Sequence, residues 1–297
     1  MYVYVNGKIL RSEDAVISVF DHGFLYGDGV YETLRAYDSV VFKLDEHLAR
    51  LFRSASLIGL TIPLDIDHLK IAVYETLIAN AFRHAYVRIT VSRGKGPIGL
   101  DPDLCPEPTI VILTQEFREY PKEYYKNGIR LIIPATRRNY RKAVNPQIKS
   151  LNFLNNILAK IEAKKKDALE AIMLNVNGYL TEGTISNIFF CKGRVLCTPS
   201  PECGILEGIT RSMVLNIAGK AGIQIKEGRF TRKDIYAAEE VFITNTTMEV
   251  MPVSKVDDHH FAVGKVAKFL RSIYQQEVRA YIAEVKAKGP SLSAENA

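Results

Sequence analysis

The sequence predicts a soluble protein of mixed α/β (α+β) structure with one large or two medium domains. Its 297 residues are about twice the usual length of a single domain. Short apolar runs bounded by turn residues predict strands, and longer segments with apolar residues three or four positions apart predict amphipathic helices. Hydrophobic residues make up 47% and charged residues 24%, which is ordinary for a globular protein and argues against wholesale disorder.

Composition and charge exclude several classes of function. The longest apolar runs, such as 110–113 and 131–133, are too short to span a bilayer, so no membrane partner is expected. The first residues show neither the basic nor the apolar region of a signal peptide, and a cytoplasmic location is expected. The net charge of +6 arises among 33 interspersed acidic residues without a basic stripe. This pattern argues against nucleic acid and leaves anionic small molecules as candidate ligands.

The cysteines and histidines do not predict a metal site. The four cysteines show no C-x-x-C spacing, and the six histidines form no metal-binding helix pattern. We therefore expect no metal, and cysteines that are reduced and partly buried.

The first half of the chain alternates between predicted strands and helices. The turn Asn6-Gly7 between two alternating runs predicts a hairpin over residues 2–10. Asp45 is the expected N-cap of a helix whose apolar stripe would direct Arg50 and Arg53 away from the core. The other predicted elements are a glycine-rich segment at 20–35, a strand at 40–43, a helix at 66–80, strands at 85–92 and 109–117, and a loop at 94–102.

The second half begins after a polar segment at 118–127, which carries Pro121 and is the best candidate for a linker. We expect an N-terminal domain over 1–120, a linker over 121–128, a C-terminal domain over 129–288 and a disordered tail over 289–297. The predicted elements are strands at 129–135, 171–175, 179–190, 195–198 and 240–253, and helices starting near 149, 208 and 263.

Lys149 is the central candidate for chemistry. It lies between Ile148 and Leu151, where a polar loop is predicted to become a helix with Leu151, Leu154, Leu158 and Ile161 on one face. A lysine held there is partly desolvated, which lowers its pKa and leaves an amine able to attack a carbonyl. A solvated surface charge is the ordinary alternative.

Other features have an ordinary explanation beside a functional one. The segment 208–211 opens a helix, where backbone amides favour a phosphate, but a simple N-cap explains it as well. The segment 244–247 is a cluster of donors or a polar turn. Glu182, before a glycine, is a carboxylate fixed in a cleft or an exposed edge residue. Tyr26 and Tyr31 either wall a pocket or belong to an ordinary bulged strand.

Six segments stand in order along nearly the whole chain. They are 26–32 (Tyr-Gly-Asp-Gly-Val-Tyr-Glu), 47–51 (His-Leu-Ala-Arg-Leu), 148–156 (Ile-Lys-Ser-Leu-Asn-Phe-Leu-Asn-Asn), 180–187 (Leu-Thr-Glu-Gly-Thr-Ile-Ser-Asn), 206–211 (Leu-Glu-Gly-Ile-Thr-Arg) and 244–250 (Thr-Asn-Thr-Thr-Met-Glu-Val). Together they resemble the class IV aminotransferases, pyridoxal-phosphate enzymes of fold type IV. The resemblance implies a small N-terminal α/β domain, a larger C-terminal pseudo-barrel α/β domain, and the cofactor in the cleft between them.

The resemblance also implies roles for individual residues. Lys149 matches the Schiff-base lysine, which carries a proton between the substrate α-carbon and the cofactor, and Glu182 the partner of the pyridine nitrogen. The positions that match the rest of the cofactor site are Arg50, Ile209, Thr210 and Thr246 for the phosphate, Leu206 for the ring face, and Asn187 in support. The positions that match substrate contacts are Tyr26, Tyr31, Tyr86, Arg88, Phe153 and Thr247.

The function implied is a branched-chain amino acid aminotransferase. Such an enzyme moves the amino group of L-leucine, L-isoleucine or L-valine to 2-oxoglutarate by a ping-pong exchange, and it is a homodimer or a larger homo-oligomer. The loop at 94–102, with its Gly-Leu-Asp-Pro, resembles that subfamily, whereas the pair Thr246-Thr247 is closer to the D-specific pattern. A D-amino-acid aminotransferase, an aminodeoxychorismate lyase and a non-catalytic basic binding protein are the alternatives.

Overall fold

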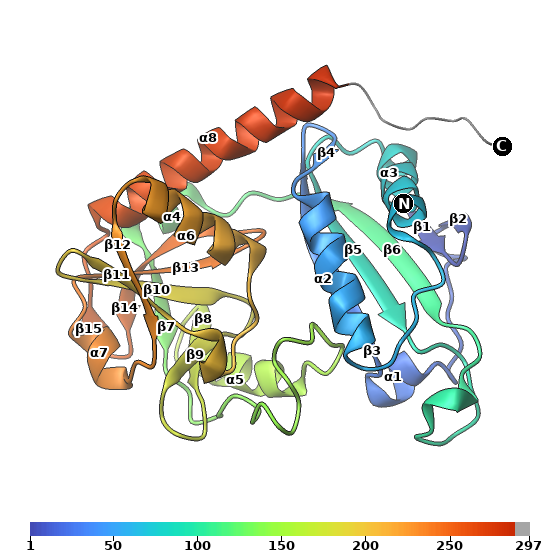
Figure 1. Cartoon of the computed structure of the whole chain (residues 1–297), viewed down its shortest axis with the longest axis horizontal. Coiled ribbons are helices and arrows are strands. Elements are labelled where there is room, and N and C mark those ends of the chain that lie inside the picture. Colours follow the sequence, from blue (N-terminus) through green and yellow to red (C-terminus); the bar gives the residue numbers. More distant parts are fainter. Residues whose placement is uncertain (289–297) are drawn as a thin grey trace. The chain divides into compact units, whose positions relative to one another are not determined.

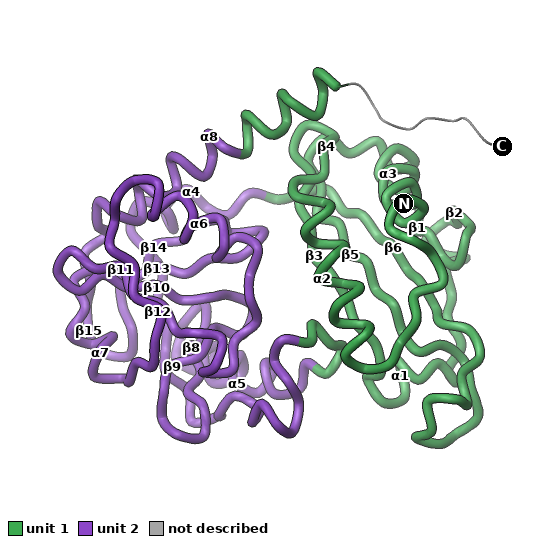
Figure 2. Tube along the Cα trace, viewed as in Figure 1, with its two compact units in different colours: residues 1–118, 148–152, 278–297 green, residues 119–147, 153–277 purple. Residues whose placement is uncertain are grey.

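The computed structural model describes residues 1–288. Contacts divide the chain into two compact units (Figure 2). Of the described residues, unit 1 comprises 1–118, 148–152 and 278–288, and unit 2 comprises 119–147 and 153–277. Lys149 therefore belongs to unit 1, although the segments 119–147 and 153–277, which flank residues 148–152 in the sequence, belong to unit 2.

Unit 1 is built on a six-stranded antiparallel sheet in the order β2-β1-β6-β5-β3-β4 (Figure 1). Its strands are β1 (Tyr2–Val5), β2 (Lys8–Arg11), β3 (Gly29–Tyr37), β4 (Val40–Val41), β5 (Ala85–Ser92) and β6 (Thr109–Glu116). Its helices are α1 (His22–Tyr26), α2 (Leu44–Ser56), α3 (Ile66–Asn80) and the 3-10 turn η1 (Pro102–Leu104). The predicted hairpin over 2–10 and helix over 66–80 are confirmed.

The two faces of this sheet differ because side chains alternate along each strand. One face carries Val30 and Leu34 of β3, which pack with α2 and α3 in a core that includes Leu48 and Leu69. The opposite face of β3 carries Tyr31, whose register partner is Thr90 of β5. Neighbouring positions of β3 therefore serve either the helix-covered core or the other face.

Helix α2 differs from expectation at its start and on its buried face. Its N-cap is Lys43, in a left-handed conformation, and Asp45 lies in the first turn, where an acidic side chain suits the helix dipole. Arg50 does not point away from the core as predicted, because it is only 5% exposed. The reason is that Glu32 of β3 supplies a buried counter-charge that the helix pattern alone does not reveal.

Unit 2 is built on a nine-stranded mixed sheet in the order β12-β11-β10-β13-β14-β7-β8-β9, with β15 paired to β14. Its strands are β7 (Ile129–Ile132), β8 (Glu170–Leu174), β9 (Leu180–Gly183), β10 (Asn187–Lys192), β11 (Val195–Pro199), β12 (Gln224–Gly228), β13 (Glu240–Asn245), β14 (Glu249–Val256) and β15 (His259–His260). Strand β9, at one end of that order, also contacts β10 and β11, so the sheet curls back on itself. The mixed α/β class predicted from the sequence is confirmed.

Five helices belong wholly or partly to unit 2. They are α4 (Lys122–Asn127), α5 (Leu154–Lys165), α6 (Ile209–Lys220), α7 (Arg232–Tyr236) and α8 (Lys265–Ala287, through Glu277), with a 3-10 turn η2 (Pro201–Cys203). The segment expected as a linker thus contains α4, which packs on β14. Helix α5 packs through Ala159 and Ala163 against Ala171 and Met173 of β8.

The expectations about membrane spans, metal sites, cysteines and the C-terminal tail can be compared with the described residues. Between residues 1 and 288, no helix combines the length and the apolar character needed to cross a membrane. Over the same residues, no cluster of three or more histidine, cysteine, aspartate or glutamate side chains is arranged to hold a metal ion. The four cysteines are free thiols. The tail predicted at 289–297 lies outside the described residues.

Candidate active site

The main chain around Lys149 is fixed by β3. The Tyr31 amide donates to the Lys149 carbonyl at 2.9 Å, and the Leu151 amide donates to the Gly29 carbonyl at 2.9 Å. The Lys149 amide in turn donates to the Ser54 hydroxyl at 3.2 Å. Because these bonds belong to an extended backbone, Lys149 is held beside a strand rather than in a helix.

This arrangement corrects the predicted helix. Helix α5 begins at Leu154, five residues after Lys149, with Phe153 as its N-cap. The apolar side chains of this helix that were expected to share one face are exposed, at 69% for Leu154 and 46% for Leu158. The helical spacing in the sequence was real, but it says only that apolar side chains share a face and not what covers that face.

The Lys149 side chain lies over an aromatic ring. Its Nζ atom is 4.6 Å from the centre of the Tyr31 ring, and the Arg88 guanidinium is 3.9 Å from the same centre. Tyr31 is 4% exposed, and burial holds the pKa of its phenol above the ordinary value. One neutral ring therefore carries two cationic side chains, which it attracts through its electron-rich faces.

Arg88 and Tyr86 are held by hydroxyl groups on the same face of the unit 1 sheet. The Arg88 Nε atom donates to the Thr90 hydroxyl at 3.2 Å. The hydroxyls of Tyr86 and Thr33 are 3.3 Å apart. The structure thus brings Tyr31, Tyr86, Arg88 and Lys149 together within unit 1.

Tyr26, also expected in the pocket, has different partners. Its hydroxyl accepts a hydrogen bond from the Gly99 amide at 3.2 Å, and its ring meets His22 edge-on at 5.0 Å. It therefore anchors the loop at 94–102, which the resemblance assigned to the branched-chain subfamily.

Arg50 forms a buried cluster with Glu32 and His47. Its Nε and Nη2 atoms donate to the two oxygens of Glu32 at 2.6 and 2.8 Å, and Glu32 also accepts from Nδ1 of His47 at 2.7 Å. Burial alone would raise the pKa of Glu32, but Arg50 and His47 outweigh it and hold that pKa far below its ordinary value. Burial lowers the pKa of His47 despite the nearby Glu32. Glu32 is therefore ionised, and the sequence reading did not single it out.

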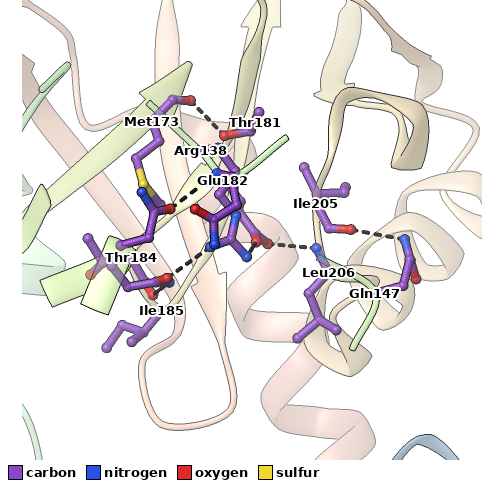
Figure 3. A network of polar contacts seen from close by, with 12 residues as sticks. Arg138, Gln147, Met173, Thr181, Glu182, Thr184, Ile185, Ile205 and Leu206 are labelled. Carbon is purple, nitrogen blue, oxygen red and sulfur yellow. Dashed lines mark hydrogen bonds and ion pairs between the residues drawn. The ribbon is translucent and has the colours of Figure 1, made fainter. Parts of the chain in front are cut away.

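Glu182 is the centre of the cluster in unit 2. At the end of β9 it is 6% exposed, and its Oε1 atom accepts from Arg138 Nη2 at 2.7 Å. Its Oε2 atom accepts from the Leu206 amide at 2.9 Å (Figure 3). The same oxygen accepts from Asn187 Nδ2 at 3.3 Å. The edge-glutamate alternative is wrong, because this carboxylate is buried and held by three donors.

Arg138 is a residue that sequence reasoning missed. It stands in a run of basic residues that resembles a solvated loop. In the structure its Nη1 atom donates to the Asn156 side-chain oxygen Oδ1 at 2.9 Å, so α5 holds the arginine against Glu182. Only the tertiary contact separates it from its exposed neighbour Arg141.

The start of α6 lies against Asn187. Gly208 is the N-cap and has no side-chain cap, and a Cβ at this position would lie 2.1 Å from the Asn187 side-chain oxygen. Asn187 also pairs with Thr244 at the end of β13. The helix amides of Ile209 and Thr210 are thereby placed next to the residue that holds Glu182, and such amides favour an anion.

Thr246 and Thr247 lie in the turn between β13 and β14. Asn245 organises this turn, because its side-chain oxygen accepts from the amides of Thr247 and Met248 at 3.0 and 2.6 Å. The Thr247 hydroxyl lies 3.5 Å from the Tyr120 hydroxyl.

These residues fit the groups of pyridoxal 5'-phosphate. Unit 1 offers an amine on a fixed backbone and an arginine held in one orientation by a buried carboxylate. Unit 2 offers a buried carboxylate for a protonated ring nitrogen, and a helix start that only glycine allows to approach Asn187 so closely.

Comparisons with known proteins agree with this chemistry. The family model of amino-transferase class IV matches residues 29–256. A Methanocaldococcus jannaschii protein, provisionally named a branched-chain-amino-acid aminotransferase, is 44% identical over 278 residues, covering 93% of this chain and 96% of its own. The D-alanine aminotransferase of Bacillus licheniformis is 33% identical over 287 residues, with 96% and 99% covered.

A solved structure supports both the fold and the cofactor. The T.th. branched-chain amino acid aminotransferase with pyridoxamine 5'-phosphate has a TM-score of 0.90 and 33% identity, with 93% of each chain covered. The fold type IV architecture and the pyridoxal-phosphate cofactor expected from the sequence are confirmed. This chain belongs to the class IV aminotransferases, pyridoxal-phosphate enzymes whose branched-chain members are among its most similar relatives.

Proposed function

We propose that this aminotransferase moves the amino group of L-leucine, L-isoleucine or L-valine to 2-oxoglutarate. The observation that carries the proposal is the Tyr31 ring, which lies beside both the Lys149 amine and the Arg88 guanidinium. The ring offers apolar contact to a hydrocarbon side chain, and the guanidinium offers a planar partner for a carboxylate. One site could then accept both a branched amino acid and glutamate.

Each of the central residues has a role in this reaction. Pyridoxal phosphate supplies an aldehyde carbon that takes up the amino group and a ring that accommodates the electron pair released at the substrate α-carbon. Lys149 Nζ would take the proton from the substrate α-carbon and carry it to the carbon that receives the amino group. Glu182 would accept a hydrogen bond from a protonated ring nitrogen, and Arg138 and the Leu206 amide hold its carboxylate in place.

We assign the phosphate to Arg50, the amides of Ile209 and Thr210, and Thr246. Leu206 would pack on the cofactor ring and Asn187 would support Glu182, with which it shares a hydrogen bond. Phe153 and Thr247 complete the proposed substrate contacts. The matching motifs support these assignments.

The test of substrate class is the visible spectrum of the purified protein after addition of one amino acid at a time. L-Leucine alone should convert the yellow form to the pyridoxamine form, and 2-oxoglutarate should restore it. Conversion by D-alanine only would place the enzyme in the D-specific branch, which the B. licheniformis relative represents. Pyruvate release from aminodeoxychorismate would indicate the lyase, and a protein that never binds pyridoxal phosphate would be a non-catalytic binder.

The role of Lys149 has its own test. Lys149→Ala should lower kcat with L-leucine by about 10²–10⁴-fold, because that is the usual contribution of a positioned acid–base group, and further through loss of the covalent attachment. Borohydride reduction followed by peptide mass spectrometry should attach the cofactor to Lys149 in the wild type only. The exposed Lys142→Ala should behave as the wild type. Cofactor attached to another lysine would contradict the assignment.

We also propose that the enzyme is a homodimer or a larger homo-oligomer. The α5 stripe (Leu154, Ile157, Leu158 and Ile161) is between 45% and 69% exposed in the single chain. A row of apolar side chains on one helix is unusual on a monomer surface and is typical of an interface.

A further inference from the structure

Glu32 is the most completely buried carboxylate near the proposed cofactor residues. It is 0% exposed and projects from the middle of β3 to the face that α2 covers. His47 and Arg50 lie one turn apart on α2, so both side chains reach the same carboxylate. The Glu32 oxygens lie 2.6–2.8 Å from the donor nitrogens of His47 and Arg50.

The contact with Glu32 fixes the orientation of the Arg50 guanidinium. Nε and Nη2 form one edge of this planar group, and that edge is the one bound to Glu32. A fork of this kind restrains both the position and the plane of the arginine. Glu32 therefore determines the direction in which the rest of the Arg50 guanidinium can bind an anion.

We propose that Glu32 is a positioning residue for the cofactor phosphate, which it serves by holding Arg50 in the orientation that receives the phosphate. The proposal rests on the proposed function, in which Arg50 binds that phosphate. Holding the arginine in advance reduces the entropy lost when the phosphate binds. Glu32 would thereby make the enzyme prefer pyridoxal 5'-phosphate over pyridoxal.

The negative charge of Glu32 also repels a phosphate, and this effect has the opposite sign. A phosphate on the far side of the Arg50 guanidinium is closer to the guanidinium than to Glu32. The ion pair of Glu32 and Arg50 therefore acts on the phosphate as a dipole with its positive end toward it. Without the Glu32 carboxylate, Arg50, which is 5% exposed, would lose the two oxygen atoms that accept its hydrogen bonds and fix the orientation of its guanidinium. We therefore expect the positioning effect to exceed the repulsion.

The experiment compares binding of pyridoxal 5'-phosphate and of pyridoxal, which lacks the phosphate, to the full-length protein freed of cofactor. The dissociation constant of pyridoxal divided by that of pyridoxal 5'-phosphate measures the preference for phosphate. Glu32→Gln should lower this ratio about tenfold or more, as expected for charge-assisted hydrogen bonds, while the affinity for pyridoxal stays within about threefold. The ³¹P resonance of the bound cofactor should also shift.

Asp28→Asn is the matched control. Asp28 forms a similar fork with Arg93 in unit 1, at 2.6 and 3.0 Å, and touches none of the residues assigned to the cofactor. This variant should lose stability but keep the wild-type preference for phosphate. An equal loss of preference in both variants would show that Glu32 acts only through general stability, and would overturn the proposal.

A double-mutant cycle with Arg50→Lys tests the mechanism. If Glu32 acts through Arg50, adding Glu32→Gln to Arg50→Lys should change the phosphate preference by less than about twofold. Independent, additive losses would overturn the proposal. If Glu32→Gln does not fold, Glu32→Asp provides the test: withdrawal of the carboxylate by one methylene should lower the preference severalfold, and an unchanged preference would overturn the proposal. A wild type without any preference for phosphate would instead refute the role of Arg50 in the proposed function.

Discussion

At the scale of single residues, buried charges are held by specific partners on neighbouring elements. Glu182 and Arg138 have side chains that are 7% and 11% exposed, and each is the other's counter-charge. Glu32 and Arg50 form a similar pair at 0% and 6%. Removal of one partner takes a buried counter-charge away from the other, so each pair should behave as a unit.

The first prediction concerns Arg138. Arg138→Met should lower the free energy of unfolding by about 3–5 kcal/mol, because it removes the Arg138 guanidinium from the buried Glu182 carboxylate. It should also lower kcat/KM with L-leucine, since Glu182 would no longer be held for the ring nitrogen. The measurements are urea unfolding and steady-state kinetics. Arg141→Met, at an exposed neighbour, is the control, and equal stability of the two variants would contradict the prediction.

The second prediction concerns the pH dependence of stability. Burial lowers the pKa of His47, so below an ordinary histidine value of about 6.5 the unfolded chain binds a proton that the folded state does not. The free energy of unfolding should therefore fall as the pH decreases from 7.5 to 5.5. Glu32, whose folded pKa is also lowered, should add to this loss at more acidic pH.

His47→Gln should remove part of that slope, measured by urea unfolding at several pH values. His68→Gln, at a side chain that is 69% exposed, provides the matched comparison and should keep the wild-type slope. An identical pH dependence of His47→Gln and the wild type would show that His47 does not titrate differently in the two states.

At the scale of elements, the start of α6 depends on close contact with β10. Asn187, the first residue of β10, touches Glu182, Leu206 and Gly208, so one side chain links a strand end, a loop and a helix start. Helix α6 has twelve residues, enough for an established dipole at its first turn. The geometry of the proposed phosphate contact therefore depends on how closely this helix approaches Asn187.

The third prediction tests that approach. Gly208→Ala would place a Cβ 2.1 Å from the Asn187 side-chain oxygen, so either the helix start or Asn187 must move. We expect weaker binding of pyridoxal phosphate in an absorbance titration, together with lower stability. Gly219→Ala, in the same helix, meets no atom closer than 4.0 Å and should stabilise the protein by up to about 1 kcal/mol. Unchanged cofactor affinity in Gly208→Ala would contradict the proposed phosphate site.

At the scale of the whole molecule, the exposed apolar side chains are concentrated on particular elements. The α5 stripe is one such group, and the segment before α1 is another, with Val16, Val19 and Phe20 between 48% and 77% exposed. Both groups are what an oligomeric enzyme would leave uncovered in a single chain.

The fourth prediction concerns assembly. Leu158→Glu should shift the mass measured by light scattering toward that of the monomer, because it places a charge in the proposed interface. Ile78→Glu changes an exposed apolar residue of another helix, 67% exposed on α3, and should leave the mass unchanged. A monomeric wild type would refute the assembly itself, and a Leu158→Glu variant of wild-type mass would remove the α5 stripe from the interface.

Local sequence signals were enough to predict several of the helices and strands. The hairpin over 2–10, the helix over 66–80 and the strand over 85–92 follow from turn residues and apolar periodicity, which act over a few neighbouring positions. The order of the six motifs indicated the aminotransferase family and its cofactor, and the family model matches residues 29–256.

Local patterns did not reveal which charged residues are buried or which residues hold them, because the partners come from other elements of the fold. Local spacing directed Arg50 away from the core and gave no reason to separate Arg138 from Arg141. Each buried arginine depends on a carboxylate brought in from a strand that is distant along the chain. The segment that carries Lys149 likewise pairs with β3 instead of extending α5, a contact that no local pattern predicts. The cost of burying a charge depends on the partners that the fold brings to it, and the local sequence does not contain these partners.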